Sequence, residues 1–263
     1  MNNIKFDFQG KTILITAGTK GIGLELTKSF LDSGANVATF SRNKKNLEFL
    51  SKKLKNYVSK EKLFIFKHDL NQLNKEKAIV NKINKYFNQK IDVLINNSGG
   101  PPSRSFLKTS NKDWSNALNV NFLSALKFSK SVIPSMKSKK WGRIINIASI
   151  YGREFGGSAP YMAAKSALIA ITKHTAIDLA KTGVTANCIA PGSIIHNKGS
   201  WEKFVENNSQ ETVNDFIKSN LPMGKFGYPE AVGDTVAFLA SKNASMILGT
   251  CINVDGGQSN SLI

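Results

Sequence analysis

The sequence predicts a single-domain, doubly wound (Rossmann-type) α/β fold with a parallel sheet of about seven strands. Short apolar runs alternate regularly with longer amphipathic stretches along the chain. The short runs are nearly continuous in apolar or β-branched residues, as expected for strands that helices cover on both faces. The 263 residues contain no repeat, no low-complexity linker and no break in composition. We therefore expect one domain over residues 1–263, with helices on both faces of the sheet.

The expected elements follow one another in strict alternation. The strands are the seven apolar or β-branched runs Thr12–Thr16, Val37–Phe40, Leu63–Phe66, Val93–Asn96, Arg143–Ala148, Val184–Ala190 and Cys251–Val254. The helices are the amphipathic segments Gly21–Leu31, Leu47–Val58, Lys75–Phe87, Trp114–Met136, Tyr161–Ala180 and Glu230–Leu239. Such alternation indicates parallel strands joined by right-handed crossovers.

The stretch after the sixth strand, residues 193–227, is too long for an ordinary connection. It contains the aromatic residues Trp201, Phe204 and Phe216. Long loops in compact domains often close over a ligand, so we expect a substrate-binding lid here. Its aromatic side chains would pack on an apolar part of the substrate or anchor the lid to the core.

The chain is strongly basic, with 36 Lys+Arg against 18 Asp+Glu and a net charge of +18. Only four of the basic residues are arginines, although arginine is favoured where phosphates and base edges are bound bidentately. Scattered lysines are more typical of solvated helix faces. We therefore expect no specific nucleic-acid partner, and a nucleic-acid-associated protein remains an alternative supported by charge alone.

Several other classes of protein are disfavoured. No apolar run approaches the roughly 18 residues that a membrane span needs, and the N-terminus lacks the architecture of a signal peptide. The two cysteines, Cys188 and Cys251, are too few for a disulfide framework and lack metal-ligand spacing. We expect a cytoplasmic protein that binds no metal and contacts no membrane.

A glycine-rich turn joins the first expected strand to the first expected helix. It reads Thr16-Ala17-Gly18-Thr19-Lys20-Gly21-Ile22-Gly23. Glycines let the backbone approach a pyrophosphate, and the N-terminus of the helix supplies unpaired N–H groups and the positive end of the dipole. Glycines also make ordinary turns, but this position between strand and helix favours a dinucleotide site.

The second strand indicates which dinucleotide binds. An NAD site places Asp or Glu at its end to bind the ribose 2′-hydroxyl, whereas this chain has Arg42. Arg42 and Lys20 would suit a 2′-phosphate, so we expect NADP(H). The alternative for Lys20 is that it is one more solvated lysine.

Tyr161 and Lys165 lie four residues apart and so share one helix face. A free phenol titrates near 10, and a nearby ammonium, with the charge of an oxidised nicotinamide, would lower that pKa. Ser149 ends the preceding strand, so both hydroxyls should lie at the carboxyl edge of the sheet, where such folds bind ligands. Tyr-x-x-x-Lys alone is also common on protein surfaces.

These motifs occur in the order found in the short-chain dehydrogenase/reductase family, which the sequence resembles from Gly10 to Gly257. The glycine turn is similar to the family's T-G-x-x-x-G-x-G, with Ala17 in place of its first glycine, and Asn96-Asn97-Ser98-Gly99 is similar to N-N-A-G. The 3-oxoacyl-[acyl-carrier-protein] reductase type is the most similar. The resemblance implies hydride transfer between NADP(H) and a carbonyl or secondary alcohol, in a homotetramer or homodimer. A non-catalytic NADP(H)-binding sensor or regulatory protein is the alternative.

The resemblance also implies roles for individual residues. Tyr161 is the general acid and base, Ser149 orients the substrate oxygen, and Lys165 holds the nicotinamide ribose and tunes the tyrosine. Asn121 keeps a water in the proton relay. Further positions that contact the cofactor by similarity are Asp69, Leu70, Asn97, Ser98, Gly99, Pro191, Gly192 and Ile194. His196 replaces a family threonine and either binds the carboxamide or diphosphate or points to solvent.

The substrate end offers further candidates. Arg104 and Arg153 fall in loops expected to wall the substrate, which suggests a small molecule with an anionic group, and Trp201 would contact its body. The alternative is that Arg153 pairs with Glu154 and Arg104 lies at the rim. A carrier-bound substrate would bring an acidic protein, which could dock on a cationic turn that is otherwise solvated. That turn contains Lys137, Lys139 and Lys140.

Overall fold

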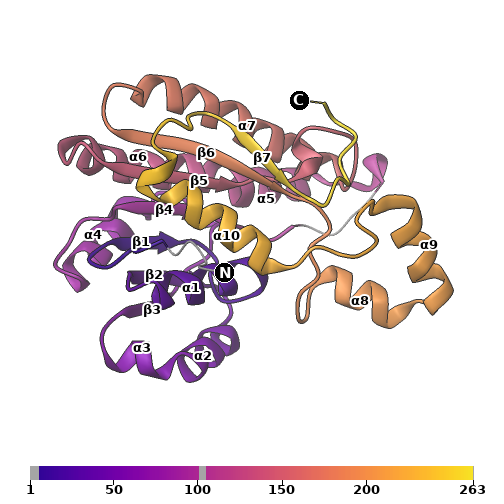
Figure 1. Ribbon diagram of the computed structural model, residues 1–263, viewed down its shortest axis with the longest axis horizontal. Coiled ribbons are helices and arrows are strands. Elements are labelled where there is room, and N and C mark those ends of the chain that lie inside the picture. Colours follow the sequence, from indigo (N-terminus) through magenta and orange to yellow (C-terminus); the bar gives the residue numbers. More distant parts are fainter. Residues whose placement is uncertain (1–5, 101–104, 263) are drawn as a thin grey trace.

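The computed structural model describes residues 6–100 and 105–262, and its centre is one sheet of seven parallel strands in the order β3-β2-β1-β4-β5-β6-β7 (Figure 1). The strands are β1 (Thr12–Ile15), β2 (Asn36–Ser41), β3 (Leu63–Lys67), β4 (Val93–Asn96), β5 (Gly142–Ile147), β6 (Val184–Pro191) and β7 (Cys251–Val254). The predicted doubly wound fold and all seven strands are confirmed. The order reverses between β1 and β4, which is where folds of this kind open a crevice for ligands.

Helices cover both faces of the sheet (Figure 1), and successive side chains of the strands join different hydrophobic clusters. On β1, Ile13 and Ile15 join one hydrophobic cluster while Leu14 joins the other. The first cluster is covered by α1 (Gly21–Asp32), α2 (Lys44–Lys53), α3 (Lys55–Ser59) and α10 (Pro229–Ala240). The second is covered by α4 (Glu76–Tyr86), α6 (Ser124–Ser138) and α7 (Ala159–Leu179). Helices therefore bury both faces of the sheet, as its apolar strands require.

Two predicted helices differ from the structure. The segment Leu47–Val58 is two helices, because Leu54 between them has φ −112° and ψ 32°, which is not helical. Trp114–Met136 was expected as one helix, but it contains α5 (Asn111–Leu118), a π-helical turn, η2 (Asn119–Leu123), and α6. A π turn adds one residue to a helix and often lies at a functional site.

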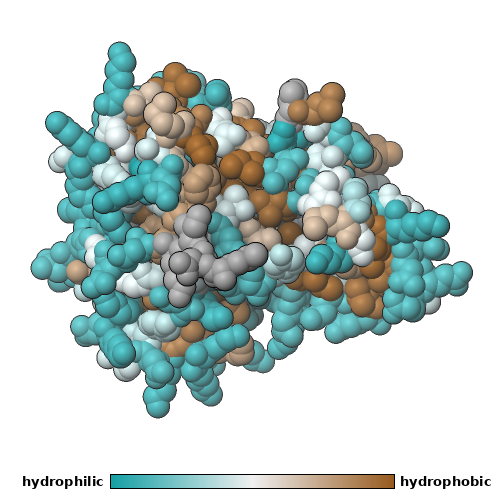
Figure 2. Space-filling model, in the orientation of Figure 1, coloured by the Kyte–Doolittle hydropathy of each residue, from teal (hydrophilic) through white to brown (hydrophobic). Residues whose placement is uncertain are grey.

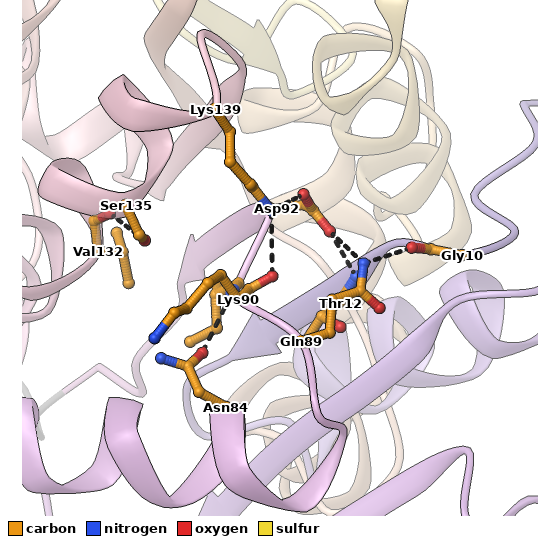
Figure 3. A network of polar contacts seen from close by, with 10 residues as sticks. Gly10, Thr12, Asn84, Gln89, Lys90, Asp92, Val132, Ser135 and Lys139 are labelled. Atoms are coloured by element: carbon orange, nitrogen blue, oxygen red, sulfur yellow. Dashed lines mark hydrogen bonds and ion pairs between the residues drawn. The ribbon is translucent and has the colours of Figure 1, made fainter.

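At the amino edge of the sheet, a buried carboxylate joins three elements (Figure 3). Asp92 accepts hydrogen bonds from the Thr12 N–H at 2.9 Å and from Gln89 Nε2 at 3.2 Å. It also forms an ion pair with Lys139, which follows α6. This network fixes the starts of β1 and β4 against the end of α6, at the edge opposite the strand ends where ligands are expected.

Residues 193–227, the lid segment, fold as α8 (Ser200–Asn207) and α9 (Gln210–Asn220), which stand away from the sheet (Figure 1). A short parallel bridge between Ile194 and Gly227 closes the base of the segment. Trp201 packs on Phe216 with ring centroids 4.9 Å apart and on Phe226 at 5.4 Å. Brown apolar side chains gather where this segment meets the body, against a largely teal periphery (Figure 2).

Candidate active site

Ser149 and Tyr161 meet at the carboxyl edge of the sheet. Ser149 follows β5 and is 7% exposed, and Tyr161 lies in the first turn of α7. The Ser149 side chain lies close enough to the Tyr161 hydroxyl to lower its pKa. One turn further along α7, the Lys165 ammonium lies 5.5 Å from the centre of the Tyr161 ring and donates to the Ile147 carbonyl at 2.6 Å. The structure therefore brings the predicted hydroxyl pair and its lysine together.

The pKa of Tyr161 differs from the expectation, and the pKa of Lys165 is shifted as well. Burial raises the pKa of Tyr161 to about 12, against the smaller effect of the neighbouring Ser149 side chain, which lowers it. Burial also lowers the pKa of Lys165 to about 7. The expectation of a lowered Tyr161 pKa is therefore wrong for the protein alone, because removal from water disfavours both charged forms. Around neutral pH, Tyr161 holds its proton.

Asn121 completes the predicted set from the π turn η2. Its side chain is almost fully buried, and its Nδ2 donates to the Ala117 carbonyl at 3.1 Å. Its Oδ1 accepts a hydrogen bond from Ser98 Oγ at 2.7 Å. Ser98 Oγ in turn accepts from Lys165 Nζ at 3.3 Å. The four predicted catalytic residues thus lie in one connected cluster, and Ser98 is a member of it that sequence reasoning placed only at the cofactor.

The glycine-rich turn is shaped for a close approach of backbone to ligand. Lys20, the N-cap residue of α1, makes no capping hydrogen bond with its side chain, so the first N–H groups of the helix are left for a ligand. A Cβ on Gly23 would lie 2.5 Å from the Ala17 carbonyl oxygen, so no larger residue fits. Ala17 itself has φ +50°, a conformation that favours glycine. These residues fit the diphosphate of a dinucleotide.

Two basic residues are expected at the cofactor ribose, and their side chains have different surroundings in the structure. Arg42 is exposed directly after β2. Lys20 Nζ donates to the Lys198 carbonyl of the lid segment. Partial burial and the neighbouring Lys203 and Lys198 lower the pKa of Lys20. Arg42 is therefore the side chain left available for a 2′-phosphate, while Lys20 connects the glycine turn to the lid segment.

His196 also lies on the glycine turn. Its Nε2 is 2.7 Å from the position that a Cβ on Gly21 would take, so the ring rests against the entrance of α1. The side chain is partly buried and therefore does not simply point to solvent. Of the alternatives left open by the sequence, this placement favours contact with the diphosphate.

The remaining cofactor positions lie after the carboxyl ends of the strands. They are Asp69 and Leu70 after β3, Asn97, Ser98 and Gly99 after β4, and Pro191, Gly192 and Ile194 at the end of β6 and after it. Asn97 Nδ2 donates to the Thr16 and Ala17 carbonyls at 3.2 Å each, so this side chain braces the glycine turn. Gln258 Oε1 accepts from the Ser193 N–H at 2.7 Å and fixes the turn after β6, a role that no sequence motif signalled.

The candidates for substrate binding have different surroundings. Arg104 lies outside the described residues. Arg153 Nη1 donates to the Cys251 carbonyl at 3.0 Å and to Asn253 Oδ1 at 2.7 Å, so the guanidinium is held against β7. Glu154, its expected alternative partner, accepts from the Ser259 hydroxyl at 2.9 Å. Trp201 lies inside an aromatic cluster formed by residues of the lid segment itself, which are Phe204, Phe216 and Phe226, so these contacts join parts of the segment to one another.

Two further features concern the described part of the chain. No helix within residues 6–100 and 105–262 is both long enough and apolar enough to cross a bilayer. In the same ranges, no three His, Cys, Asp or Glu side chains are grouped as metal ligands would be.

Comparison with known proteins extends over nearly the whole chain. The family model described as Enoyl-(Acyl carrier protein) reductase matches residues 16–259. The 3-oxoacyl-[acyl-carrier-protein] reductase of Rickettsia typhi is 34% identical over 253 residues, covering 95% of this chain and 98% of the relative. The enzyme of the same name from Thermotoga maritima is 31% identical over 252 residues, with 95% and 98% covered.

Two solved structures have a similar fold. A variant of actinorhodin polyketide ketoreductase, crystallised with NADPH, has a TM-score of 0.86 and 27% identity, covering 95% of this chain and 98% of that chain. YwfH, an NADPH-dependent reductase involved in bacilysin biosynthesis, has a TM-score of 0.86 and 28% identity, with 96% and 99% covered. With the Ser149, Tyr161 and Lys165 cluster, these similarities show that the chain belongs to the short-chain dehydrogenase/reductase family and resembles its 3-oxoacyl-[acyl-carrier-protein] reductases.

Proposed function

We propose that the protein is an NADP(H)-dependent oxidoreductase that reduces a carbonyl to a secondary alcohol, with Tyr161 as the general acid and base. The observation that carries this proposal is the cluster of three side chains, in which Ser149 lies close to the Tyr161 hydroxyl and Lys165 lies beside the ring. The names of the relatives, 3-oxoacyl reductases and a ketoreductase, support a carbonyl substrate.

The residues that would hold the cofactor are those of the glycine turn and the strand ends. The entrance of α1 would bind the diphosphate, and Arg42 would bind the 2′-phosphate. This choice of cofactor is supported by the ketoreductase crystallised with NADPH and by YwfH, which is an NADPH-dependent reductase. When bound, the nicotinamide supplies or accepts the hydride.

The chain's own residues supply the proton. Because burial keeps Tyr161 protonated around neutral pH, the tyrosine can give its phenolic proton to the substrate oxygen as negative charge develops there. The Ser149 hydroxyl donates a second hydrogen bond to that oxygen and stabilises the same charge. As the proton leaves, the nearby Lys165 ammonium favours the phenolate that remains on Tyr161.

A panel of ketones, aldehydes and 3-oxoacyl thioesters, followed by oxidation of NADPH and NADH, tests this function. We expect turnover with a preference for NADPH. Tyr161→Phe should lower kcat at least about 100-fold, the usual contribution of a general acid, while NADPH binding measured by fluorescence stays unchanged. A fully active Tyr161→Phe enzyme would contradict the mechanism. NADPH binding without turnover of any carbonyl would favour the sensor alternative.

We propose a carrier-bound 3-oxoacyl group as the substrate class, because the relatives carry that activity in their names. Of the expected docking lysines, Lys139 is engaged by Asp92, whereas Lys137 and Lys140 are exposed. Turnover of the same acyl group on a small thiol and on an acidic carrier protein should be compared. A lower KM for the carrier form that is lost in a Lys137→Ala, Lys140→Ala double variant supports docking there. Equal KM values for the two forms would contradict it.

A further inference from the structure

The Ser98 side chain connects Lys165 with Asn121 in the candidate catalytic cluster. Ser98 Oγ donates to Asn121 Oδ1 at 2.7 Å and accepts from Lys165 Nζ at 3.3 Å. Lys165 is 1% exposed and Asn121 is 2% exposed, so water has little access to either group. The family motif N-N-A-G has an alanine at this place, which has no hydroxyl, so the motif itself does not imply this connection.

The two hydrogen bonds of Ser98 restrict the orientations of the Lys165 and Asn121 side chains. With the bonds to Ser98 and to the Ile147 carbonyl, two of the three N–H groups of Lys165 have fixed acceptors. Asn121 Nδ2 is held by the Ala117 carbonyl, so the bond from Ser98 fixes the other end of the same amide. Both side chains are thereby held in single orientations.

We propose that the Ser98 hydroxyl is a positioning group of the active site, which holds the Lys165 ammonium beside Tyr161 and ties it to Asn121. This inference rests on the proposed function for its catalytic consequence. Ser98 acts through Lys165, because within the described residues its side chain is hydrogen-bonded to Lys165 and Asn121 and not to the Tyr161 hydroxyl. Its measurable effect is therefore expected on the charge of Lys165.

A hydrogen bond to a charged donor is among the stronger ones, so Ser98 favours the charged form of Lys165 against the effect of burial. The other titratable groups near the ammonium are Tyr161 on α7 and Cys188 on β6, and Tyr151 lies beyond Tyr161. Since none of these is altered by a change at Ser98, a shift in the titration of Lys165 can be assigned to the lost hydroxyl.

The direct test is an NMR titration of protein labelled with 13Cε-lysine, in which Lys165→Arg identifies the resonance of Lys165. We expect Ser98→Ala to lower the titration midpoint of Lys165 by about one pH unit, a tenfold loss of proton affinity. Ser98→Thr, which keeps the hydroxyl, should titrate like the unaltered protein. Ser124→Ala is the matched control, because this buried serine donates to the Val120 carbonyl and has no hydrogen bond to Lys165 or Asn121 within the described residues.

Steady-state kinetics test the catalytic consequence. We expect Ser98→Ala to lower kcat about tenfold and to move the alkaline limb of its pH profile to lower pH, with the NADPH dissociation constant changed less than twofold. Ser98→Thr should restore the limb. An unchanged Lys165 midpoint in Ser98→Ala, or equal shifts in the alanine and threonine variants, would overturn the proposal. The titration midpoint of Lys165 can be measured even if the protein turns over no carbonyl substrate. A failure of the proposed function can therefore be distinguished from a failure of this inference.

Discussion

The Lys165 amine is buried, and its pKa of about 7 lies well below the ordinary value of 10.5. Between these two pH values, the unfolded chain binds more protons at this residue than the folded chain does. The free energy of unfolding therefore rises with pH in that window, by at most about 1.4 kcal/mol per pH unit from this group. In Lys165→Met this contribution is absent, so we expect the unaltered protein to gain stability relative to the variant as pH rises from 7 to 9.

Denaturant unfolding of both proteins at pH 6, 7, 8 and 9 measures this difference. The range stops at pH 9 because burial raises the pKa of Tyr161 to about 12, so that a second group begins to contribute near pH 10. A stability difference that stays constant over the four pH values would show that Lys165 does not titrate anomalously.

Arg42 follows β2, and its side chain makes no hydrogen bond or ion pair within the described residues. If it binds the 2′-phosphate, Arg42→Ala removes a bond to a charged group, whose contribution is about 1.5–3 kcal/mol. We expect the KM for NADPH to rise about 10- to 100-fold, while the KM for NADH changes less than about twofold. Lys45→Ala, at an exposed lysine of α2, is the control. Equal changes for both cofactors would contradict the role of Arg42.

Single residues show what the sequence can and cannot predict. The four expected catalytic residues lie together because motif spacing and strand order place them at one edge of the sheet. The direction of the Tyr161 pKa could not be predicted, because it depends on how completely distant segments bury the hydroxyl. The Ser98 bridge was hidden for a similar reason, since its partners come from a turn and a helix far along the chain.

At the scale of elements, the aromatic cluster holds α8 and α9 together. Trp201 contacts Phe204, Phe216 and Phe226, so we expect Trp201→Ala to open this segment locally. Loss of a large aromatic side chain from a core costs about 3–5 kcal/mol, and Trp201 is partly exposed, so about 2–3 kcal/mol is expected here. Hydrogen exchange of the α8 and α9 amides measures the effect. Phe49→Ala, at an exposed ring of α2, is the control.

Unchanged protection of α8 and α9 in Trp201→Ala would contradict an anchoring role. If the KM of the substrate rose in that variant while protection stayed unchanged, the alternative contact between Trp201 and the substrate would be favoured.

Elements also differ in how far the sequence predicts them. Strands were predicted closely because a run buried on both faces has a nearly continuous apolar pattern. The break at Leu54 was not visible, because apolar residues continue on both sides of it. Two helices in the lid segment were missed, although Ser209, whose side chain accepts from the Thr212 N–H, is a recognisable N-cap that could have located α9.

At the scale of the whole molecule, the Asp92 network fixes the amino edge of the sheet (Figure 3). Asp92→Ala leaves the Thr12 N–H without its acceptor and removes the carboxylate that pairs with Lys139. The Lys139 side chain is 34% exposed and still donates to the Lys90 carbonyl, so we expect the free energy of unfolding to fall by about 1–3 kcal/mol, chiefly from the unpaired N–H. Denaturant midpoints measure the loss, with Lys140→Ala as the control at an exposed neighbour. Because the network lies away from Tyr161, kcat of the folded variant should stay within about twofold. A large fall in kcat at full stability would contradict this separation.

Much of the excess positive charge lies in one part of the molecule. Between Arg42 and Lys90 the sequence has 14 basic and four acidic residues, a net charge of +10. This segment forms α2, α3, β3 and α4, beside the expected adenine end of the cofactor crevice, and hydrophilic side chains cover that side in Figure 2. Its summed field would attract an anionic dinucleotide without any single lysine forming a specific contact.

Because of the π turn η2, the number of residues between α5 and α6 matters for the active site. A π turn holds one residue more than an α-helical turn, so the helices on either side of it keep their relative rotation. Deleting one residue within Asn119–Leu123 would therefore let α5 and α6 join as a regular helix, with the apolar face of α6 still on the sheet. Asn121 lies in the turn itself, so the deletion would move its side chain relative to Ser98. The extra residue of the π turn is therefore what sets the position of Asn121 beside Ser98, so the length of this turn is constrained together with the identity of Asn121.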